Sequence, residues 1–243
     1  MVRRPDELIV EEPLEVRLDG HLVTVTMRTP GDDFELAAGL CFTDGLLGGA
    51  PVTGCRYCGE CGSAAETEFN VVTVETGGRA PVPTPRLATT SSSCGICGSA
   101  SIDDLRQRLR PLRGLTEFPL DVLTHAPDRV RAQQTLFGRT GAVHAAAAFA
   151  VDGEPIVVRE DIGRHNAVDK VVGRLLFDDR LPAPELALYV SGRASFEIVQ
   201  KAWAAGFAAV VAVSAPSSLA VETAHAAGLV LAGFARDSRA NVY

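Results

Sequence analysis

Long apolar runs, a surplus of basic residues and internal repeats are all missing from this 243-residue sequence. No stretch of about 18 uncharged apolar residues occurs, and the beginning, Met1 to Glu7, leads into short alternating segments without a signal-peptide core. The 23 Lys and Arg residues are outnumbered by 30 Asp and Glu, which gives a net charge of −7, whereas a phosphate backbone favours a basic surface. We therefore expect a cytoplasmic protein that binds neither a membrane nor nucleic acid in general. A locally basic spot would still accept an anionic small molecule.

The composition is that of an ordinary globular protein. With 47% hydrophobic and 22% charged residues, the chain is long enough to bury a substantial core, as one large domain or one domain with a smaller appendage. It contains six cysteines. In a reducing compartment, cysteines are more often catalytic or metal-binding than members of a disulfide framework. The sequence therefore directs attention to thiol chemistry.

Cys94 and Cys97 are the most informative feature of the sequence. They lie two residues apart in a run of small residues, 91–98, which follows a proline-rich stretch and precedes a helical pattern that opens near Ser101. Cys-x-x-Cys spacing, or proximity to a helix N-terminus, lowers the pKa of a thiol below its usual value of about 8.5. We interpret the pair as nucleophilic thiols. Half of a zinc site and an incidental reduced pair are the alternatives.

The N-terminal part of the chain predicts a small mixed unit. Two strands are predicted over 14–18 and 22–27, with a turn at Asp19 and Gly20. A helix over 34–40 and a further strand over 69–74 follow. No low-complexity tract interrupts it.

The C-terminal half alternates strands and helices. Apolar runs predict strands over 187–190, 208–213 and 229–234, and helical spacing predicts helices over 196–205 and 219–227. Strands that are apolar throughout pair in parallel, with helices packed on the sheet. In such sheets ligands bind beyond the carboxyl ends of the strands.

Three predicted loops lie at those carboxyl ends and are rich in serine, glycine and arginine. They span residues 191–195, 214–218 and 233–239. The first two precede helix N-termini, where free N–H groups and the helix dipole favour an anion. Serine and glycine are also common as plain helix caps, which is the alternative for any one loop. Taken together, the three loops predict a site for a phosphate-bearing ligand.

A block of mixed charge lies between the thiol pair and these loops. Residues 157–170 carry arginines, acids, a histidine and an asparagine, and the apolar spacing from Val168 to Leu176 places the block at the junction of a strand and a helix. Such a cluster either binds a polar ligand or forms a surface ion-pair network. His144, among alanines, is the other histidine of interest, although a lone histidine in such company is more often a satisfied core residue.

Seven motifs cover nearly the whole chain in order: residues 28–33, 92–98, 140–146, 159–170, 191–193, 214–216 and 233–243. Together they closely resemble the FdhD family of formate dehydrogenase accessory sulfurtransferases. The resemblance implies an α/β fold with a cytidine-deaminase-like three-layer core, a mixed sheet and a smaller N-terminal α+β portion. It also implies a single domain over 1–243, divided into a hairpin, helix and variable Cys-containing loop (1–85), a sulfur-transfer loop and helix (86–110) and a cofactor-binding core (111–243).

By the same resemblance the protein is a sulfurtransferase with a cysteine persulfide intermediate. It takes sulfur from an IscS-type cysteine desulfurase and passes it to the molybdenum or tungsten bis-molybdopterin guanine dinucleotide cofactor, before that cofactor enters the catalytic subunit of formate dehydrogenase. The cofactor is therefore bound as cargo, and GDP is expected to bind as its fragment. The protein is expected to be a homodimer without a metal ion of its own.

The resemblance also assigns individual residues. It makes Cys94 the persulfide residue and Cys97 its partner. The family's cofactor-binding segment corresponds to Phe234, Ala235, Arg236, Asp237, Ser238 and Arg239. Further residues for cofactor contact or support of the sulfur loop are His144, Arg164, His165 and Arg193.

Cys55, Cys58 and Cys61 form a cluster outside this family pattern. Three thiols at two-residue gaps in a Gly-rich loop suit zinc or an iron–sulfur cluster, but the local sequence lacks a fourth ligand. A metal site, a secondary sulfur relay and no role at all stay open for this cluster.

Three rival functions fit parts of the sequence. A zinc nucleoside deaminase has His-x-Glu followed by Pro-Cys-x-x-Cys, whereas here the order is reversed and Ala146 stands where the glutamate after His144 would be. A thiol-disulfide oxidoreductase would use Cys94 and Cys97, but its pair belongs near a βαβ pattern rather than after a proline-rich loop. A non-catalytic molybdenum-cofactor chaperone would leave the two thiols without a use.

Overall fold

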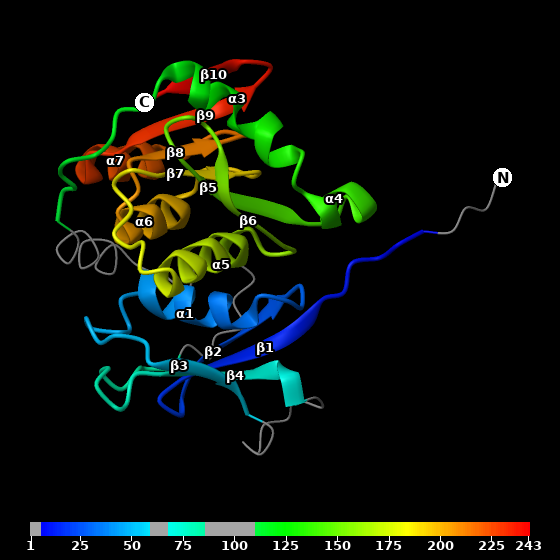
Figure 1. Ribbon diagram of the computed structural model, residues 1–243, viewed down its shortest axis with the longest axis vertical. Helices are drawn as coiled ribbons and strands as arrows, with labels where there is room; N and C mark the ends of the chain where they lie inside the picture. The colour runs from blue at the N-terminus through cyan, green and yellow to red at the C-terminus, as the bar shows by residue number, and fades with distance from the viewer. Residues whose placement is uncertain (1–5, 59–67, 86–109) are drawn as a thin grey trace.

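The computed structural model describes residues 6–58, 68–85 and 110–243, which form two β-sheets (Figure 1). Within these residues no helix is long and apolar enough to cross a membrane. The larger sheet belongs to the C-terminal half and the smaller one to the N-terminal part. Helices α1 (Asp33–Thr43) and α5 (Arg164–Phe177) lie between the two sheets.

The larger sheet has six strands in the order β10-β9-β8-β7-β5-β6. They are β5 (His144–Phe149), β6 (Pro155–Asp161), β7 (Ala187–Val190), β8 (Ala209–Ala212), β9 (Val230–Arg236) and β10 (Arg239–Val242). Strands β7, β8 and β9 are parallel, as their apolar runs predict. Strand β5 is antiparallel to both of its neighbours and β10 is antiparallel to β9, so the sheet is mixed.

Helices cover both faces of this sheet. They are α3 (Leu120–Arg131), α6 (Phe196–Ala205) and α7 (Ser218–Ala227), together with α5, whereas the short helix α4 (Thr135–Thr140) has no buried residue. Successive strand residues point to opposite faces: Leu188 and Val210 pack with α5, α6 and α7, whereas Tyr189 and Val211 pack with α3. The three-layer α/β core expected from the sequence is therefore confirmed.

The smaller sheet has four strands in the order β2-β1-β4-β3. They are β1 (Glu12–Leu18), β2 (His21–Arg28), β3 (Gly54–Tyr57) and β4 (Val71–Glu75), and a short 3-10 helix, η1 (Glu68–Asn70), precedes β4. The predicted hairpin is present, with Asp19 and Gly20 both at positive φ as a tight two-residue turn requires. One face of this sheet packs on α1, which completes the predicted α+β portion.

Two sequence-based predictions were wrong at their ends. The strand predicted to end at residue 234 continues to Arg236 and turns directly into β10, so the third predicted loop is the tip of a hairpin. The turn was missed because Asp237 and Ser238 adopt left-handed backbone without the glycine that usually signals such a turn. The strand predicted from residue 69 begins only at Val71, after η1.

The two sheets are joined through a close crossing of α1 and α5. A Cβ atom at Gly39 would overlap the carbonyl oxygen of Asp169, and a Cβ atom at Gly173 would overlap that of Glu35. The two helix backbones therefore touch at these glycines, and no larger residue fits there.

Gly173→Ala is expected to lower the free energy of unfolding by about 3 kcal/mol or more, because the new methyl group meets a backbone oxygen that cannot rotate away. Urea unfolding followed by circular dichroism measures the change. Gly138→Ala is the matched control, because it lies in α4 with open space around it and alanine favours the helix. Equal effects of the two substitutions would contradict the close crossing.

Candidate functional site

The predicted motifs meet at one edge of the larger sheet, where β7 and β8 end. Strand β6 ends at the same edge with Asp161, and the antiparallel β5 begins there with His144; these two residues pair across the strands. Ser191 follows β7 directly, and Ser214 lies two residues after β8. Segments far apart in the sequence therefore share the carboxyl edge, where ligands bind in sheets of this kind.

The first two predicted loops lead into helix N-termini. Ser217 caps α7, because its hydroxyl accepts a hydrogen bond from the N–H of Ala220 at 3.2 Å. Ser195 occupies the same position before α6, but its hydroxyl forms no such bond. The first-turn N–H groups of α6 therefore lack a side-chain cap from this serine.

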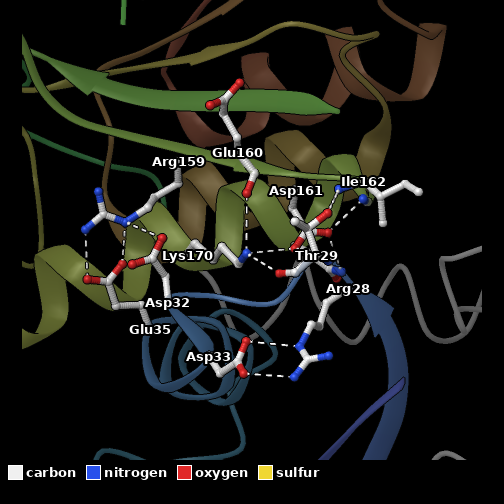
Figure 2. A network of polar contacts seen from close by, with 12 residues as sticks. Arg28, Thr29, Asp32, Asp33, Glu35, Arg159, Glu160, Asp161, Ile162 and Lys170 are labelled. Atoms are coloured by element: carbon white, nitrogen blue, oxygen red, sulfur yellow. Dashed lines mark hydrogen bonds and ion pairs between the residues drawn. The ribbon is translucent and has the colours of Figure 1, made fainter. Parts of the chain in front are cut away.

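Asp161 is the centre of a buried network that fixes the charged block (Figure 2). Its carboxylate accepts hydrogen bonds from the backbone N–H groups of Thr29 at 3.1 Å and Gly163 at 2.8 Å. It also accepts one from Nδ2 of Asn166 at 2.9 Å and lies 2.8 Å from Nζ of Lys170. Lys170 in turn donates to the carbonyl oxygen of Thr29 at 3.0 Å. The network ties the β2–α1 turn to the start of α5.

Two more ion pairs hold α1 in place. Arg159 donates to the carboxylate of Glu35 at 2.6 and 2.8 Å. Lys201 donates to Asp169 at 2.8 Å and to Oγ1 of Thr43 at 2.8 Å. Burial raises the pKa of Asp169 to about 6. For Lys201, burial alone would lower the pKa, but the carboxylates of Asp169 and Asp44 that face the ammonium group raise it. Most of the charged block is therefore an ion-pair network, which was one of the two predicted alternatives, but it is largely buried rather than at the surface.

Arg164 and His165 are left out of this network. Arg164 Nε, His165 Nε2 and Ser195 Oγ are buried without a hydrogen-bond partner in the part of the chain that the structure describes. Burial, with the nearby charge of Arg164, lowers the pKa of His165 to about 4, so its ring is neutral at neutral pH. Its Nε2 lies 4.0 Å from the carboxylate of Glu197, beyond hydrogen-bond distance. Because an unpaired buried polar atom costs about 1–3 kcal/mol, a ligand or water that pairs with these atoms is favoured.

His144 lies beside these residues and is not the satisfied core histidine that its alanine neighbours suggest. It is half-buried at the start of β5, and its Nδ1 lies 3.4 Å from Oγ of Ser191. That oxygen already accepts the N–H of Ala145 at 2.9 Å, so the serine hydroxyl proton is left for the ring. Burial and the charge of Arg164 lower the pKa of His144. Gly192 also borders the ring and Arg164.

Phe234 lies at a β-bulge near the other end of the same edge. The pairing of β9 with β10 shifts register between Arg239 and Asn241, and Phe234 on the opposite strand has a φ of 55°. Such bulges re-aim side chains, and the ring of Phe234 is 41% exposed. Its backbone N–H donates to the carbonyl oxygen of Ser214 at 3.2 Å, which holds the bulge beside the loop after β8. An exposed ring in this position suits stacking against a flat heterocycle.

Arg236 and Arg239 face each other across the tip of the hairpin. Between them, Asp237 and Ser238 form a two-residue turn with φ values of 50° and 57°. Directly opposed residues share a face of a hairpin, and like charges there repel each other. Both arginines are exposed, and neither forms an ion pair with another described residue. A phosphate between the two guanidinium groups would convert this repulsion into two charge-assisted contacts.

The remaining predicted residues lie along the same edge. Ala235 is buried beside α3, Asp237 is exposed at the hairpin tip, and Arg193 is exposed in the loop after β7. Strand β9 is separated from β5 by three strand spacings, or roughly 14 Å. The hairpin and the His144 cluster therefore lie on the same edge of the sheet, three strands apart.

Cys94 and Cys97 lie outside the described residues, as does Cys61. Two described cysteines are free thiols: Cys41 is buried in α1 and Cys55 is partly buried in β3, which corrects the prediction that Cys55 belongs to a loop. Burial raises the pKa of both thiols, that of Cys55 to about 12, so neither is a ready nucleophile.

The described residues contain no group of three or more His, Cys, Asp and Glu side chains placed to hold a metal ion. Ala146, at the position where a zinc deaminase carries its glutamate, is buried in β5. The described part of the edge therefore offers hydrogen-bonding and anion-binding groups.

Three comparisons place this geometry among known proteins. A model of the FdhD/NarQ family matches residues 9–243. The sulfur carrier protein FdhD of Nocardia farcinica is 50% identical over 246 residues, which cover 100% of this chain and 88% of that relative. The protein of the same name from Mycobacterium tuberculosis is 47% identical over 252 residues, covering 100% and 91%.

A solved structure matches as well. A crystal structure from Desulfotalea psychrophila, assigned as a formate dehydrogenase accessory protein, has a TM-score of 0.73 and 23% identity to this chain. The match covers 96% of this chain and 86% of that one. At this level of identity the likeness shows that the fold is shared.

Lys170→Met is expected to lower the free energy of unfolding by about 3–5 kcal/mol, because it leaves the buried Asp161 carboxylate without its counter-charge. Urea unfolding measures the loss. Arg174→Met is the matched control on the same helix, where the arginine pairs with Asp178 at the surface, and its unfolding midpoint should hardly move. A similar small shift for both variants would show that the Asp161 network does not stabilise the fold.

Proposed function

Because the chain belongs to the FdhD/NarQ family, we propose that it is a sulfur carrier that serves formate dehydrogenase. It accepts sulfur from a cysteine desulfurase of the IscS type as a cysteine persulfide, and it delivers that sulfur to a bound molybdopterin guanine dinucleotide cofactor. The observation that carries the proposal is the opposed pair Arg236 and Arg239 beside the exposed ring of Phe234, on the same sheet edge as the unpartnered polar atoms of Arg164 and His165.

The sulfur steps balance with the two thiols of the Cys-x-x-Cys motif. The Cys94 thiolate attacks the outer sulfur of the desulfurase persulfide; that S–S bond breaks, and the desulfurase leaves as a thiolate. The Cys97 thiolate then attacks the inner sulfur of the Cys94 persulfide. A Cys94–Cys97 disulfide forms, the outer sulfur leaves as hydrosulfide to the metal of the cargo, and a dithiol reductant reopens the disulfide. The raised pKa values of Cys41 and Cys55 support this choice of thiols.

The hairpin end of the edge supports binding of the nucleotide part of the cargo. The Phe234 ring offers a stacking surface, and the two arginines next to it offer charge-assisted hydrogen bonds to phosphate. A net charge of −7 does not oppose this, because the hairpin tip, with two arginines and one aspartate, is locally positive.

The other end supports contact with the rest of an elongated ligand. His144 and His165 have lowered pKa values, and a neutral histidine both donates and accepts hydrogen bonds. Arg164 and Ser195 add donors there. A dinucleotide cofactor is an elongated ligand and could contact both ends of the edge. Dinucleotides bind in this way across the crevice of other open α/β sheets.

Two alternative functions use only part of this arrangement. A thiol-disulfide oxidoreductase needs the Cys94 and Cys97 pair but has no use for the arginine hairpin. A cofactor chaperone without sulfur chemistry needs the hairpin but not the thiols. The desulfurase and the catalytic subunit of formate dehydrogenase are the proposed partners, a homodimer is the proposed assembly, and the cytoplasm is the proposed location.

After incubation with a cysteine desulfurase and cysteine, the peptide that contains Cys94 and Cys97 should gain the mass of one sulfur atom, because Cys-x-x-Cys spacing favours a low thiol pKa there whereas burial raises that of Cys55 to about 12. Peptide mass spectrometry makes the measurement. Cys94→Ala should abolish maturation of formate dehydrogenase and Cys97→Ala should impair it severely, with unchanged unfolding. Cys55→Ser is the control and should load sulfur normally. Sulfur found only on the peptide with Cys55, Cys58 and Cys61 would overturn the assignment.

GDP should bind the protein, and Arg236→Ala or Arg239→Ala should weaken binding by on the order of 1–3 kcal/mol through loss of a charge-assisted contact. Calorimetry measures the affinity. Arg56→Ala, which removes an exposed arginine from the smaller sheet, is the control and should leave it unchanged.

Sulfur loading and nucleotide binding should also be separable. The double variant Cys94→Ala, Cys97→Ala should bind GDP normally, and Arg239→Ala should still accept sulfur. Unchanged GDP affinity in both arginine variants would remove the hairpin from the site. Loss of GDP binding in a well-folded double cysteine variant would make the thiols themselves part of the cofactor site.

A further inference from the structure

The tip of the β9–β10 hairpin is held in an unfavourable conformation. Asp237 and Ser238 are both in the left-handed region, at φ values of 50° and 57°, and neither is glycine. Left-handed backbone is costly for any residue with a Cβ atom, and two-residue turns of this kind favour Asn-Gly for that reason. The repulsion between the opposed Arg236 and Arg239 adds to the cost. Such a tip keeps one conformation only when its surroundings hold it.

His125 on α3 supplies that support. Its Nε2 lies 3.0 Å from Oγ of Ser238, and its Nδ1 lies 2.6 Å from the carbonyl oxygen of Asp121. Because a carbonyl oxygen only accepts, Nδ1 carries a proton and donates it to Asp121, and Nε2 forms a second hydrogen bond with the hydroxyl of Ser238. Among the described residues, Ser238 is the one tip residue whose side chain is hydrogen-bonded to the body of the protein.

Helix α3 is a firm base for this contact. Its residues Val122, Leu123 and Ala126 are buried against the larger sheet, in the same apolar cluster as Ala235 of β9. The hydrogen bond from Nδ1 of His125 to the carbonyl oxygen of Asp121, one helical turn earlier, also fixes the orientation of the His125 ring. The hairpin is therefore attached to α3 twice, at its base by apolar packing and at its tip by the histidine.

We propose that His125 is the positioning residue of the nucleotide-binding hairpin. By holding Ser238 against α3, it keeps Arg236 and Arg239 side by side before a phosphate arrives. This inference rests on the proposed function, in which the two arginines bind the phosphates of the cargo. A preformed pair of arginines binds more tightly than a mobile one, because less conformational freedom is lost on binding. His125 acts through Ser238 and does not itself touch the ligand.

The affinity for GDP tests the proposal. His125→Ala should weaken GDP binding by about three- to tenfold, the size expected for one lost hydrogen bond, and Ser238→Ala should do the same. The double variant should be no weaker than either single one, because both substitutions remove the same contact. His125→Gln, which keeps an acceptor near the position of Nε2, should recover most of the affinity. His225→Ala, an exposed histidine of α7, is the matched control and should bind GDP normally.

A second measurement does not depend on the ligand. Amide hydrogen exchange at residues 236–239 should speed up in His125→Ala, while the unfolding midpoint stays close to that of the unaltered protein. Unchanged exchange and unchanged GDP affinity would overturn the proposal, and so would additive effects of the His125 and Ser238 substitutions. If the unaltered protein fails to bind GDP, the proposed function fails, while the exchange measurement still decides whether His125 holds the tip.

Discussion

The buried carboxylate of Asp161 is the constraint on which the rest of the structure depends. It is fully buried, and such a group is tolerated only when its charge and its lone pairs are satisfied. Lys170 supplies the charge, and N–H groups from the β2–α1 turn and from the start of α5 supply the hydrogen bonds. These contacts hold the β2–α1 turn of the smaller unit against the larger sheet. The same placement sets the direction in which Arg164 and His165 leave the first turn of α5.

The close crossing of α1 and α5 completes that arrangement. Gly39 and Gly173 let the helix backbones meet, and this brings Glu35 of α1 to Arg159 and Thr43 of α1 to Asp169. The charged block of the sequence thus serves mainly as a connection between two packed units. Arg164 and His165 are the residues of the block whose buried polar atoms lack such partners in the described part of the chain, and they are therefore the ones proposed to bind a ligand.

The sequence predicted the regular elements well and the irregular ones poorly. The β1–β2 hairpin, α1 and the alternating strands and helices from β7 to β9 follow from apolar periodicity and from a glycine-containing turn. The β9–β10 hairpin was missed because its turn residues, Asp237 and Ser238, carry no such signal and are held instead by His125. Helix α3 was missed too; it contains Pro127, which argues locally against a helix.

The sequence by itself determined the family motifs, the Cys-x-x-Cys spacing of residues 94–97 and the position of each charged residue along the chain. Only the tertiary structure decided which charges are structural. Neighbouring residues of a helix point about 100° apart, so His165 and Asn166 face different surroundings although they are adjacent. Asp161 and Arg159 each have a partner more than 120 residues earlier in the chain, Thr29 and Glu35 respectively. Local patterns do not encode contacts at such separations, and these contacts decide which side chains remain free to bind.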